Sequence, residues 1–430
     1  MKKEIGIGLM GFGVIGSSTA RALTNKKEPL TKQAYSPLDL KKILEKDKTK
    51  YGTLGISREL FTDRLDEIVS NPEIDIVIEL IGGEQPAFDF ISQALCAGKH
   101  VVTANKEVMA KHGFELLELA RSHQVDIRYE ASVGGGIPLI APFKRDLIAN
   151  YILTIYGIVN GTTNYILTRM AHENLDFSEA LKQAQKLGYA EANPTNDIEG
   201  FDAAYKLAIM ATIAFGIDVK TENIYHEGIS KLQACDFRYA KELGYAIKLL
   251  AIAKRSGDEI EARVHPVFIS EDSLLAKVDG VYNAVNIEGD LVGNVIFYGQ
   301  GAGPSPTSSA ILADVINIAQ NINRGLQYTP HLSSGSTLTI KPMEEIETRY
   351  YIRMSIVDQA GVLAQISKVL GDHFISIASV IQKEVDPEKQ TAEIVVMTHP
   401  TIEKSMREAI KDAGQLPVVQ KINNFIRVEV

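Results

Sequence analysis

Short apolar runs alternate with segments of helical periodicity over the first 137 residues. Strands are predicted at residues 5–10, 40–44, 74–81 and 100–103, and helices at 17–23 and 87–97. Strands that are buried on both faces read as nearly unbroken apolar runs, and their alternation with helices is typical of a doubly wound parallel sheet. We therefore predict an α/β domain of this type at residues 1–133.

The pattern changes after residue 134. Strands are predicted at 151–159, 262–268, 281–287 and 291–298, and they no longer alternate strictly with helices. This order indicates a second α/β domain with a mixed sheet at residues 134–304. A helix near residues 305–322 follows, and we expect it to pack back on the first domain.

The last third of the chain has an order of its own. Residues 321–341 are polar and contain Pro330 and Gly335, which favours a linker at 321–347. From Arg349 the pattern predicts strand, helix, strand, strand, helix and strand, with turns at 358–361 and 386–388. That order is ferredoxin-like, so a third domain is predicted at 348–430.

Composition narrows the classes of function. The 430 residues carry 45 basic and 54 acidic side chains without a basic stripe, so no nucleic-acid partner is expected. The longest apolar stretch, residues 207–217, is shorter than the roughly 18 residues of a membrane span. The two cysteines match no metal or redox spacing, which favours a reduced, cytoplasmic protein. The apolar N-terminal run resembles a secretion signal only superficially, because Glu4 interrupts it.

A glycine motif explains that run better. Gly11, Gly13 and Gly16 form the spacing G-x-G-x-x-G between a predicted strand and helix, with Phe12, Val14 and Ile15 between them. These glycines allow a tight turn, close approach of a pyrophosphate, and close packing of helix on strand. The motif predicts a Rossmann-type site for NAD or NADP; the alternative is a purely structural turn.

The cofactor preference depends on the end of the second strand. An acidic residue about 20 positions after the motif favours NAD through the ribose hydroxyl. Here residues 25–37 look like an insertion, and Glu45-Lys46-Asp47-Lys48 follows the strand. Its lysines, together with Arg58, suit a 2′-phosphate and tilt the expectation toward NADP, although a solvated charge run explains them nearly as well.

Two lysines are candidates for chemistry. Lys106 follows Thr103 at the carboxyl end of a predicted strand, the edge where α/β sheets bind ligands. Lys206 lies in an apolar helix with Asp202 one turn before it, on the same face. Burial would lower the pKa of such a lysine toward the range useful for proton transfer. The alternatives are a surface lysine at 106 and a structural ion pair at 202 and 206.

Polar residues precede that helix. Glu191 and Asp197 lie in the loop that leads into it, so three carboxylates and one lysine converge on its start. Residues 160–164 (Asn-Gly-Thr-Thr-Asn) end a strand and either cap the next helix or line the same pocket. No zinc-protease motif, nucleophile elbow or P-loop occurs.

Taken together, these residues resemble the homoserine dehydrogenase family, in the long bacterial form with a C-terminal ACT domain. The resemblance covers nearly the whole chain. Residues 161–167, residues 188–191 and the stretch from Asp197 to Lys206 carry it most specifically.

The resemblance implies interconversion of L-homoserine and L-aspartate 4-semialdehyde with NAD or NADP, on the route to threonine, methionine and isoleucine. Lys206 resembles the proton donor of the family and Lys106 its second essential lysine. Glu191 and Asp202 resemble the residues that hold the substrate ammonium, with Asp197 in support. Gly188 and Gly303 would contact the cofactor, near Thr103.

The resemblance also implies ligands beyond the substrate. A monovalent cation such as sodium would be held largely by backbone carbonyls at Glu130, Val133, Gly135 and Ile137. The ACT domain implies an amino-acid effector, with threonine favoured, and a homo-oligomer, dimer or tetramer. The alternatives are another amino-acid-linked dehydrogenase on this scaffold, a non-catalytic nucleotide and amino-acid sensor, and, for the tail, a dimerisation module that binds nothing.

Overall fold

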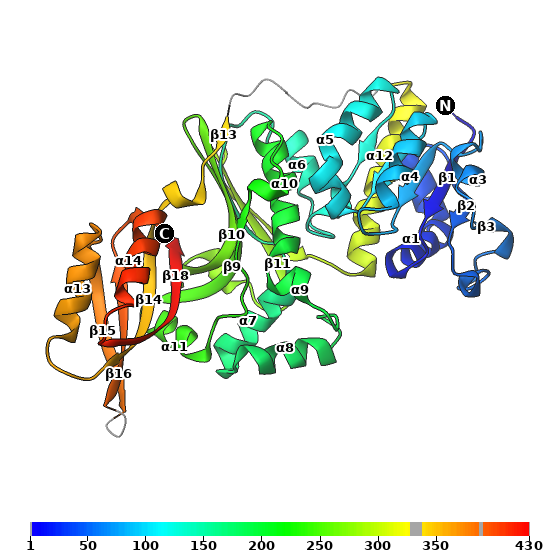
Figure 1. Cartoon of the computed structure of the whole chain (residues 1–430). Coiled ribbons are helices and arrows are strands. Elements are labelled where there is room, and N and C mark those ends of the chain that lie inside the picture. Colours follow the sequence, from blue (N-terminus) through cyan, green and yellow to red (C-terminus); the bar gives the residue numbers. More distant parts are fainter. Residues whose placement is uncertain (1, 327–337, 387–389, 430) are drawn as a thin grey trace. The chain divides into compact units, whose positions relative to one another are not determined.

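The computed structural model describes residues 2–326, 338–386 and 390–429 (Figure 1). The chain divides into two compact units. The first comprises Met1–Ile155, Ala204–Ile224 and Tyr282–Leu338, and the second comprises Tyr156–Ala203, Tyr225–Val281 and Thr339–Val430. Strand β7 (Ile152–Ile158) and helix α10 (Phe201–Phe215) each contribute residues to both units.

The first unit contains a six-stranded parallel sheet in the order β3-β2-β1-β4-β5-β6. Its strands are β1 (Ile5–Met10), β2 (Leu38–Leu44), β3 (Phe61–Thr62), β4 (Ile76–Glu79), β5 (His100–Thr103) and β6 (Ile127–Arg128). Every residue of β1 is buried, as an unbroken apolar run requires. This order is that of dinucleotide-binding sheets, so the predicted doubly wound fold is confirmed.

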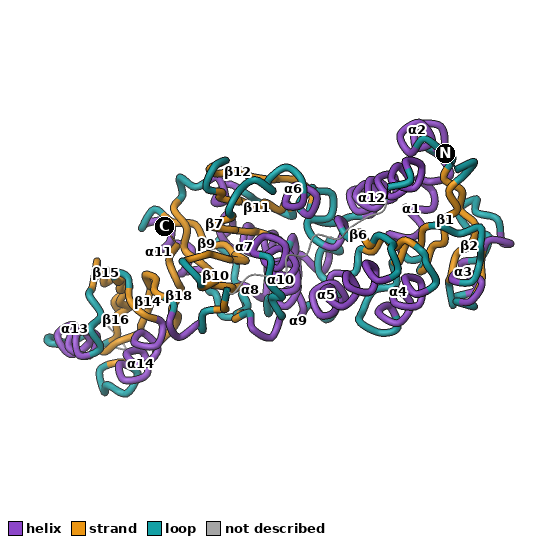
Figure 2. Tube along the Cα trace, turned by 90° about the horizontal axis from the view of Figure 1, so that it is seen from above, coloured by secondary structure: helices purple, strands orange, loops and turns teal. Residues whose placement is uncertain are grey.

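Helices cover both faces of this sheet. The helices are α1 (Val14–Asn25), α2 (Lys27–Ala34), α3 (Asp66–Val69), α4 (Ala87–Cys96), α5 (Lys106–Ser122), α6 (Ile140–Lys144) and α12 (Pro304–Arg324). Figure 2 shows α1 and α12 on one face and α4 and α5 on the other. Ile311 and Val315 of α12 join Ile5 and Ile7 of β1 in one buried cluster. The hairpin β11 (Tyr282–Gly289) and β12 (Gly293–Gln300) belongs to the same unit.

The second unit is built on a mixed sheet that contains the run β9-β10-β18-β14-β16-β15. Its strands are β8 (Tyr225–His226), β9 (Tyr245–Ser256), β10 (Glu259–Ser270), β13 (Thr339–Ile340), β14 (Glu347–Val357), β15 (Ile377–Asp386), β16 (Thr391–Thr398), β17 (Thr401–Ile402) and β18 (Val419–Glu429). Its helices are α7 (Gly161–Glu173), α8 (Phe177–Lys186), α9 (Thr195–Ile198), α11 (Ala234–Glu242), α13 (Val362–Asp372) and α14 (Glu403–Ala413).

The tail folds in the predicted βαββαβ order. Strand β14, helix α13, strands β15 and β16, helix α14 and strand β18 follow one another, with the short β17 before α14. Figure 2 shows α13 and α14 on one face of these strands, and Ile366 and Met406 pack with Ile352 in the core between them. Strand β18 also pairs in parallel with β10, where Val267 lies opposite Arg427. The last strand of the tail is therefore continuous with the sheet of the preceding segment.

Several segments differ from the sequence prediction. The expected linker begins inside α12, which runs to Arg324, and β13 and β14 occupy part of its second half. The expected insertion at 25–37 forms α2. The long strand β9 was missed, because residues 247–253 are all buried and no apolar–polar alternation marks the strand. Residues 327–337 of the linker, and Pro387 and Glu388 of the predicted turn, lie outside the described residues.

Candidate active site

The three glycines of the motif do different work. A Cβ atom on Gly16 would lie 2.0 Å from the Gly11 carbonyl oxygen, and one on Gly11, whose φ is 94°, would lie 2.6 Å from the Leu80 carbonyl oxygen. Gly13, the residue before α1, has no heavy atom within 4 Å of such a Cβ atom. Gly11 and Gly16 are thus needed for packing, whereas Gly13 leaves room for a ligand beside the first turn of α1.

Glu45, the residue after β2, faces this loop. Its Oε2 accepts a hydrogen bond from the Phe12 N–H at 3.1 Å and from the Lys50 ammonium at 3.0 Å. Burial opposes ionisation, but these bonds and one from the Asp47 N–H hold the pKa of Glu45 below its usual value. Lys48 pairs with Asp63 at 2.8 Å. The carboxylate nearest the glycine loop is therefore ionised, and two nearby lysines already have carboxylate partners.

Residues at the end of β5 form a polar cluster. The buried Thr103 hydroxyl donates to Glu79 at 2.6 Å and accepts from the Asn105 N–H at 2.9 Å. The Asn105 side chain accepts from the Val108 N–H and so caps α5. Lys106 is the first residue of that helix and is half-buried. The hydroxyl of Thr103 is thus used within the protein, while Lys106 occupies the predicted carboxyl edge of the sheet.

Helix α10 begins with the predicted acid and lysine. Asp202 is 2% exposed, and Lys206 is half-buried one turn later. In the first unit, Tyr205 lies beneath the Lys111 ammonium of α5, with 5.8 Å between the nitrogen and the ring centroid. The helix that begins at Lys106 and the helix that carries Lys206 therefore meet at this contact.

An asparagine joins the two predicted aspartates. The Nδ2 of Asn160 donates to Asp197 at 2.7 Å and to Asp202 at 2.8 Å. Its Oδ1 accepts from the Thr163 N–H and caps α7. Sequence reasoning left open whether this segment caps a helix or lines the pocket, and the structure shows that Asn160 caps α7 and also holds both carboxylates. We had not placed Asn160 among the site residues, because nothing local reveals its partners about 40 residues away.

Gly188 and Glu191 flank the loop before α9. Gly188 has a φ of 76°, which favours glycine, and it follows α8. The Thr162 hydroxyl donates to the Tyr189 carbonyl at 2.6 Å and ties this loop to α7. Glu191 is exposed, and its carboxylate makes no hydrogen bond or ion pair with a described residue. The structure thus brings Asp197 and Asp202 together but leaves Glu191 free in the solvent.

The loop of the expected cation site is held by Glu130. The Glu130 carboxylate accepts three backbone N–H bonds, from Leu139 at 2.6 Å, Ile140 at 2.9 Å and Ala141 at 2.7 Å, and so caps α6. The buried carbonyls of Val133, Gly135 and Ile137 accept no backbone hydrogen bond from described residues. Oxygen atoms of this kind suit a hard cation. The backbone of this loop therefore fits the predicted group, whereas the Glu130 side chain is already used.

A second glycine-rich loop, at residues 299–303, packs against the loop at residues 133–137. A Cβ atom on Gly135 would lie 2.5 Å from the Gly301 carbonyl oxygen. Gly303, with a φ of 124°, precedes α12. Both positions require glycine, and they keep the N-terminus of α12 beside the loop at 133–137.

Family comparisons decide the identity. Residues 11–130 match the NAD-binding domain of homoserine dehydrogenase, residues 138–316 match homoserine dehydrogenase itself, and residues 350–418 match the ACT domain. A homoserine dehydrogenase of Helicobacter pylori is 44% identical, with each chain covered completely. The chain belongs to the homoserine dehydrogenase family.

Solved structures agree with this assignment. A homoserine dehydrogenase from Thiobacillus denitrificans superposes with a TM-score of 0.92 and 42% identity, covering 99% of this chain and 98% of the other. A hyperthermophilic archaeal homoserine dehydrogenase in complex with NADPH has a TM-score of 0.62 and 26% identity, covering 73% of this chain and 97% of the other. The chain is therefore an NAD(P)-dependent homoserine dehydrogenase with an ACT regulatory domain, and the predicted family, fold class and activity are confirmed.

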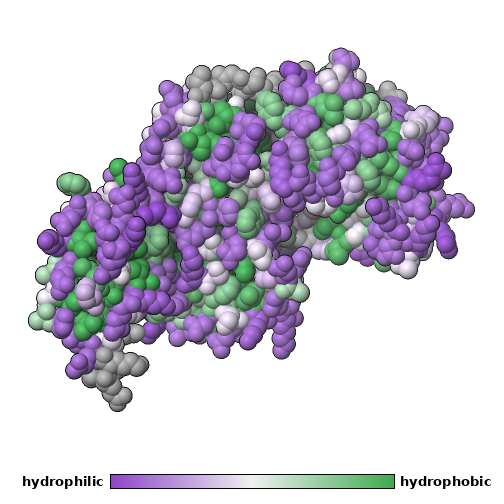
Figure 3. Space-filling view, viewed as in Figure 1, coloured by the Kyte–Doolittle hydropathy of each residue, from purple (hydrophilic) through white to green (hydrophobic). Residues whose placement is uncertain are grey.

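Two further features bear on the alternatives. Burial raises the pKa of the Cys235 thiol to about 11, which is the opposite of what a nucleophilic cysteine needs. None of the described helices is long and apolar enough to cross a membrane. On the face shown in Figure 3, hydrophilic residues cover much of the surface, with hydrophobic residues interspersed among them.

Proposed function

We propose that Lys206 transfers the proton in the interconversion of L-homoserine and L-aspartate 4-semialdehyde. The observation that carries this proposal is the start of α10, where a buried carboxylate, Asp202, precedes Lys206 by one turn on one helix face. Reduction of an aldehyde builds negative charge on its oxygen, and an ammonium can both stabilise that charge and supply the proton. In the reverse direction the neutral amine of Lys206 accepts the hydroxyl proton.

We assign the other predicted residues to the binding of substrate, cofactor and cation. Asp202 and Glu191 hold the substrate ammonium, Asp197 and Asn160 keep Asp202 in place, and Lys106 supports the reacting end. The nicotinamide cofactor, when bound, supplies the hydride acceptor or donor. The proposed binding site of that cofactor consists of Gly11, Phe12, Gly13, Val14, Ile15, Gly16, Thr103, Gly188 and Gly303. The proposed binding site of a monovalent cation is the loop at 130–137. We also propose a dinucleotide-binding domain at residues 1–133, a catalytic domain at 134–304 and an ACT-like domain at 348–430.

The test of the proton-transfer role is Lys206→Ala. We expect kcat for homoserine oxidation to fall by at least ~100-fold, the usual scale of general acid–base catalysis. Nucleotide affinity, measured by fluorescence titration of NADPH and NADH, is expected to stay within two-fold. Lys241→Ala, an exposed lysine on α11, is the control. Near-normal turnover in Lys206→Ala would contradict the assignment.

We also propose that NAD is the better cofactor, in place of the NADP expected from the sequence. In Rossmann-type sheets the residue after the second strand faces the adenosine ribose, and an acidic residue there hydrogen-bonds the 2′-hydroxyl. The support is the ionised Glu45 carboxylate on the Phe12 N–H, because a 2′-phosphate beside it would meet a like charge. Lys48, one of the two lysines in the run that suggested NADP, is paired with Asp63, and the nearby Lys50 is paired with Glu45 itself.

Side-by-side assays with NAD and NADP test this preference. We expect kcat/KM to favour NAD by at least ~10-fold, about 1.4 kcal/mol of like-charge repulsion and lost hydrogen bonding. Glu45→Gln is expected to reduce the ratio, while Glu67→Gln, at a half-buried carboxylate of the same unit that pairs with Lys42, leaves it unchanged. A preference for NADP in the unaltered chain would overturn the proposal.

For the tail we propose an amino-acid effector, threonine, at the loop that precedes α13. Gly361 has a φ of 88° and ends the turn that begins at Asp358. We further propose a cytoplasmic homo-oligomer, a dimer or tetramer. Light scattering of the purified chain measures the oligomer, and homoserine oxidation with and without threonine measures the effector. An unchanged rate at saturating threonine would contradict the effector.

A further inference from the structure

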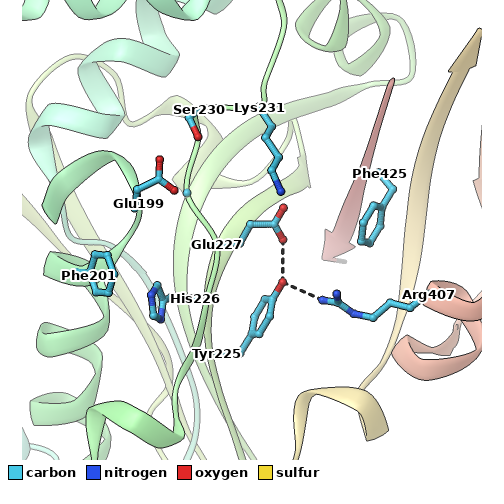
Figure 4. A pocket seen from close by; sticks show the side chains of 10 residues that line it. Glu199, Phe201, Tyr225, His226, Glu227, Ser230, Lys231, Arg407 and Phe425 are labelled. Carbon is cyan, nitrogen blue, oxygen red and sulfur yellow. Dashed lines mark hydrogen bonds between the residues drawn. The ribbon is translucent and has the colours of Figure 1, made fainter. Parts of the chain in front are cut away.

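A cavity of about 400 Å³ lies within the second unit. It lies where the ACT segment (residues 348–430) meets the part of the catalytic segment (residues 134–304) that belongs to this unit. This volume is within the range of small-molecule sites. Figure 4 shows Glu199 and Phe201 on one side of it, and Arg407 and Phe425 on the other. The remaining lining residues are Tyr225, His226, Glu227, Gly228, Ser230 and Lys231. None of them belongs to the proposed catalytic, cofactor or ACT-loop residues.

Charges of both signs face this cavity, and two of them have no ionic partner among the described residues. The Glu199 carboxylate and the Lys231 ammonium make no ion pair or hydrogen bond with a described residue. Arg407 donates through Nε to Glu403 at 2.7 Å and through Nη2 to the Tyr225 hydroxyl at 2.9 Å, which leaves Nη1 without a described acceptor. The cavity therefore offers the Glu199 carboxylate, the Lys231 ammonium and the Nη1 of Arg407, whose charge is paired with Glu403. A second carboxylate in the lining, Glu227, is paired with Arg427.

The wall behind these groups is rigid. The Glu227 carboxylate accepts from Tyr225 at 3.0 Å and from the buried Arg427 at 2.9 Å. A Cβ atom on Gly228 would lie 2.3 Å from the Ile198 carbonyl oxygen, so the segment that follows β8 packs tightly against the end of α9. Preorganised charges of this kind recognise a ligand at low entropic cost.

We propose that this cavity binds a small α-amino acid as its zwitterion, with the ligand ammonium on Glu199 and the ligand carboxylate between Lys231 and Arg407. Phe201 and Phe425 would contact an aliphatic side chain. A doubly anionic ligand is disfavoured because Glu199 and Glu227 would repel it, and a dication would meet Lys231 and Arg407. The site is separate from the loop at Asp358.

The cavity shares a segment with the substrate side. Residues 197–202 present Asp197 and Asp202 to Asn160, and they present Glu199 and Phe201 to the cavity. A ligand that fixes Glu199 against Arg407 therefore fixes the start of α10 against the ACT segment. Binding in the cavity and binding of homoserine are coupled, and thermodynamic linkage makes this coupling reciprocal.

Calorimetry on the full chain without nucleotide tests the site independently of turnover. The probes are L-threonine and its isostere L-valine, with 3-hydroxybutanoate, which lacks the ammonium, and 1-amino-2-propanol, which lacks the carboxylate. We expect at least one amino acid to bind, and each analogue that lacks a charge to bind at least 10-fold more weakly. Failure of both amino acids to bind, or equal binding of the analogues, overturns the proposal.

Variants locate the site. Glu199→Gln and Lys231→Gln are expected to weaken amino-acid binding at least 10-fold, with unchanged melting temperatures. Lys241→Gln, an exposed lysine on α11, is the matched control. If Asp358→Asn removes binding while Glu199→Gln and Lys231→Gln leave it within two-fold, the ligand lies at the ACT loop and the proposal is overturned.

Kinetics test the coupling, which rests on the homoserine dehydrogenase activity. In the unaltered chain the bound amino acid is expected to change KM for homoserine about 5-fold or more, within the usual range of allosteric coupling. Glu199→Gln is expected to lose this effect and to keep its kcat in the absence of effector. A KM that responds equally in Glu199→Gln and in the unaltered chain would overturn the coupling.

Discussion

The two sheets of this chain differ in where their ionisable side chains lie. Inside the parallel sheet the buried strand residues are mainly apolar, as in β1, and the buried Glu79 and Thr103 lie at the carboxyl ends of β4 and β5. Glu45 and Lys106 lie just beyond the strand ends. Inside the mixed sheet, ionisable side chains are buried within the strands themselves, among them Arg263, His265, Arg353, Arg427 and Glu429. In the first sheet ligand binding and stability are separable. In the second, stability depends on charges that must stay paired.

The buried charges of the mixed sheet attach the ACT segment to the catalytic segment. Arg427 of β18 donates to Glu403 at 2.9 Å and to Glu227 at 2.9 Å. Arg353 of β14 donates to Asp236 of α11 at 2.7 Å. A buried ion that loses its partner costs far more than an exposed one, so the Arg427–Glu227 and Arg353–Asp236 pairs fix one relative position of the two segments.

Arg427→Met is the change with the largest expected effect. It removes a buried cation and leaves Glu403 and Glu227 without that partner, which is expected to lower the free energy of unfolding by about 3–5 kcal/mol. Urea denaturation followed by circular dichroism measures it. Lys421→Met, an exposed lysine on the same strand, is the control and is expected to change stability by less than about 0.5 kcal/mol. A small loss in Arg427→Met would remove the contrast between the sheets.

The same network predicts a pH dependence. Burial opposes ionisation of Glu403, but hydrogen bonds from Arg427 and Tyr350 hold its pKa below the usual value. Its contribution to stability is therefore complete above the unfolded pKa of about 4.3 and is lost as the pH falls through the lower folded pKa.

Two glycine substitutions in the motif after β1 test whether ligand binding and stability are separable in the first unit. Gly16→Ala places a methyl group 2.0 Å from a backbone oxygen and is expected to lower the free energy of unfolding by about 1–3 kcal/mol. Gly13→Ala meets open space at a φ of −75°, so stability is expected to change by less than about 0.5 kcal/mol while nucleotide affinity falls about 10-fold. Denaturation and nucleotide titration of both variants measure this. Equal loss of stability in the two would show that the loop serves packing alone.

His265 predicts a second dependence of stability on pH. Burial, together with the neighbouring Arg427 and Arg263, lowers its pKa well below the usual value, and its Nε2 lies 3.0 Å from Arg263. The unfolded chain takes up this proton below about pH 6.5 and the folded chain does not, so stability falls with falling pH by up to about 1.4 kcal/mol per unit. Melting curves between pH 5 and 8 measure the slope. His265→Gln is expected to flatten it, and the exposed His123→Gln to leave it; an unchanged slope in His265→Gln contradicts the assignment.

Local pattern was enough for much of the fold. The apolar run of β1, the glycine spacing after it and the βαββαβ order of the tail each depend on neighbours within a few residues, and each was predicted correctly. The Asp202 and Lys206 pair was also predictable, since residues four apart share a helix face. Strand β9 was missed because residues 247–253 are all buried, so no apolar–polar alternation marks the strand, and Lys248 interrupts its apolar run.

The sequence by itself determined the family, the parallel sheet, the glycine loop and the candidate lysines, because short-range periodicity and motif spacing carry them. Only the tertiary structure decided which distant groups meet. Asn160 reaches Asp202 across 42 positions, Phe12 reaches Glu45 across 33, and Arg427 reaches Glu227 across 200. A buried polar group is stable only beside its hydrogen-bond partner. The sequence identifies the polar group but not the distant residue that pairs with it.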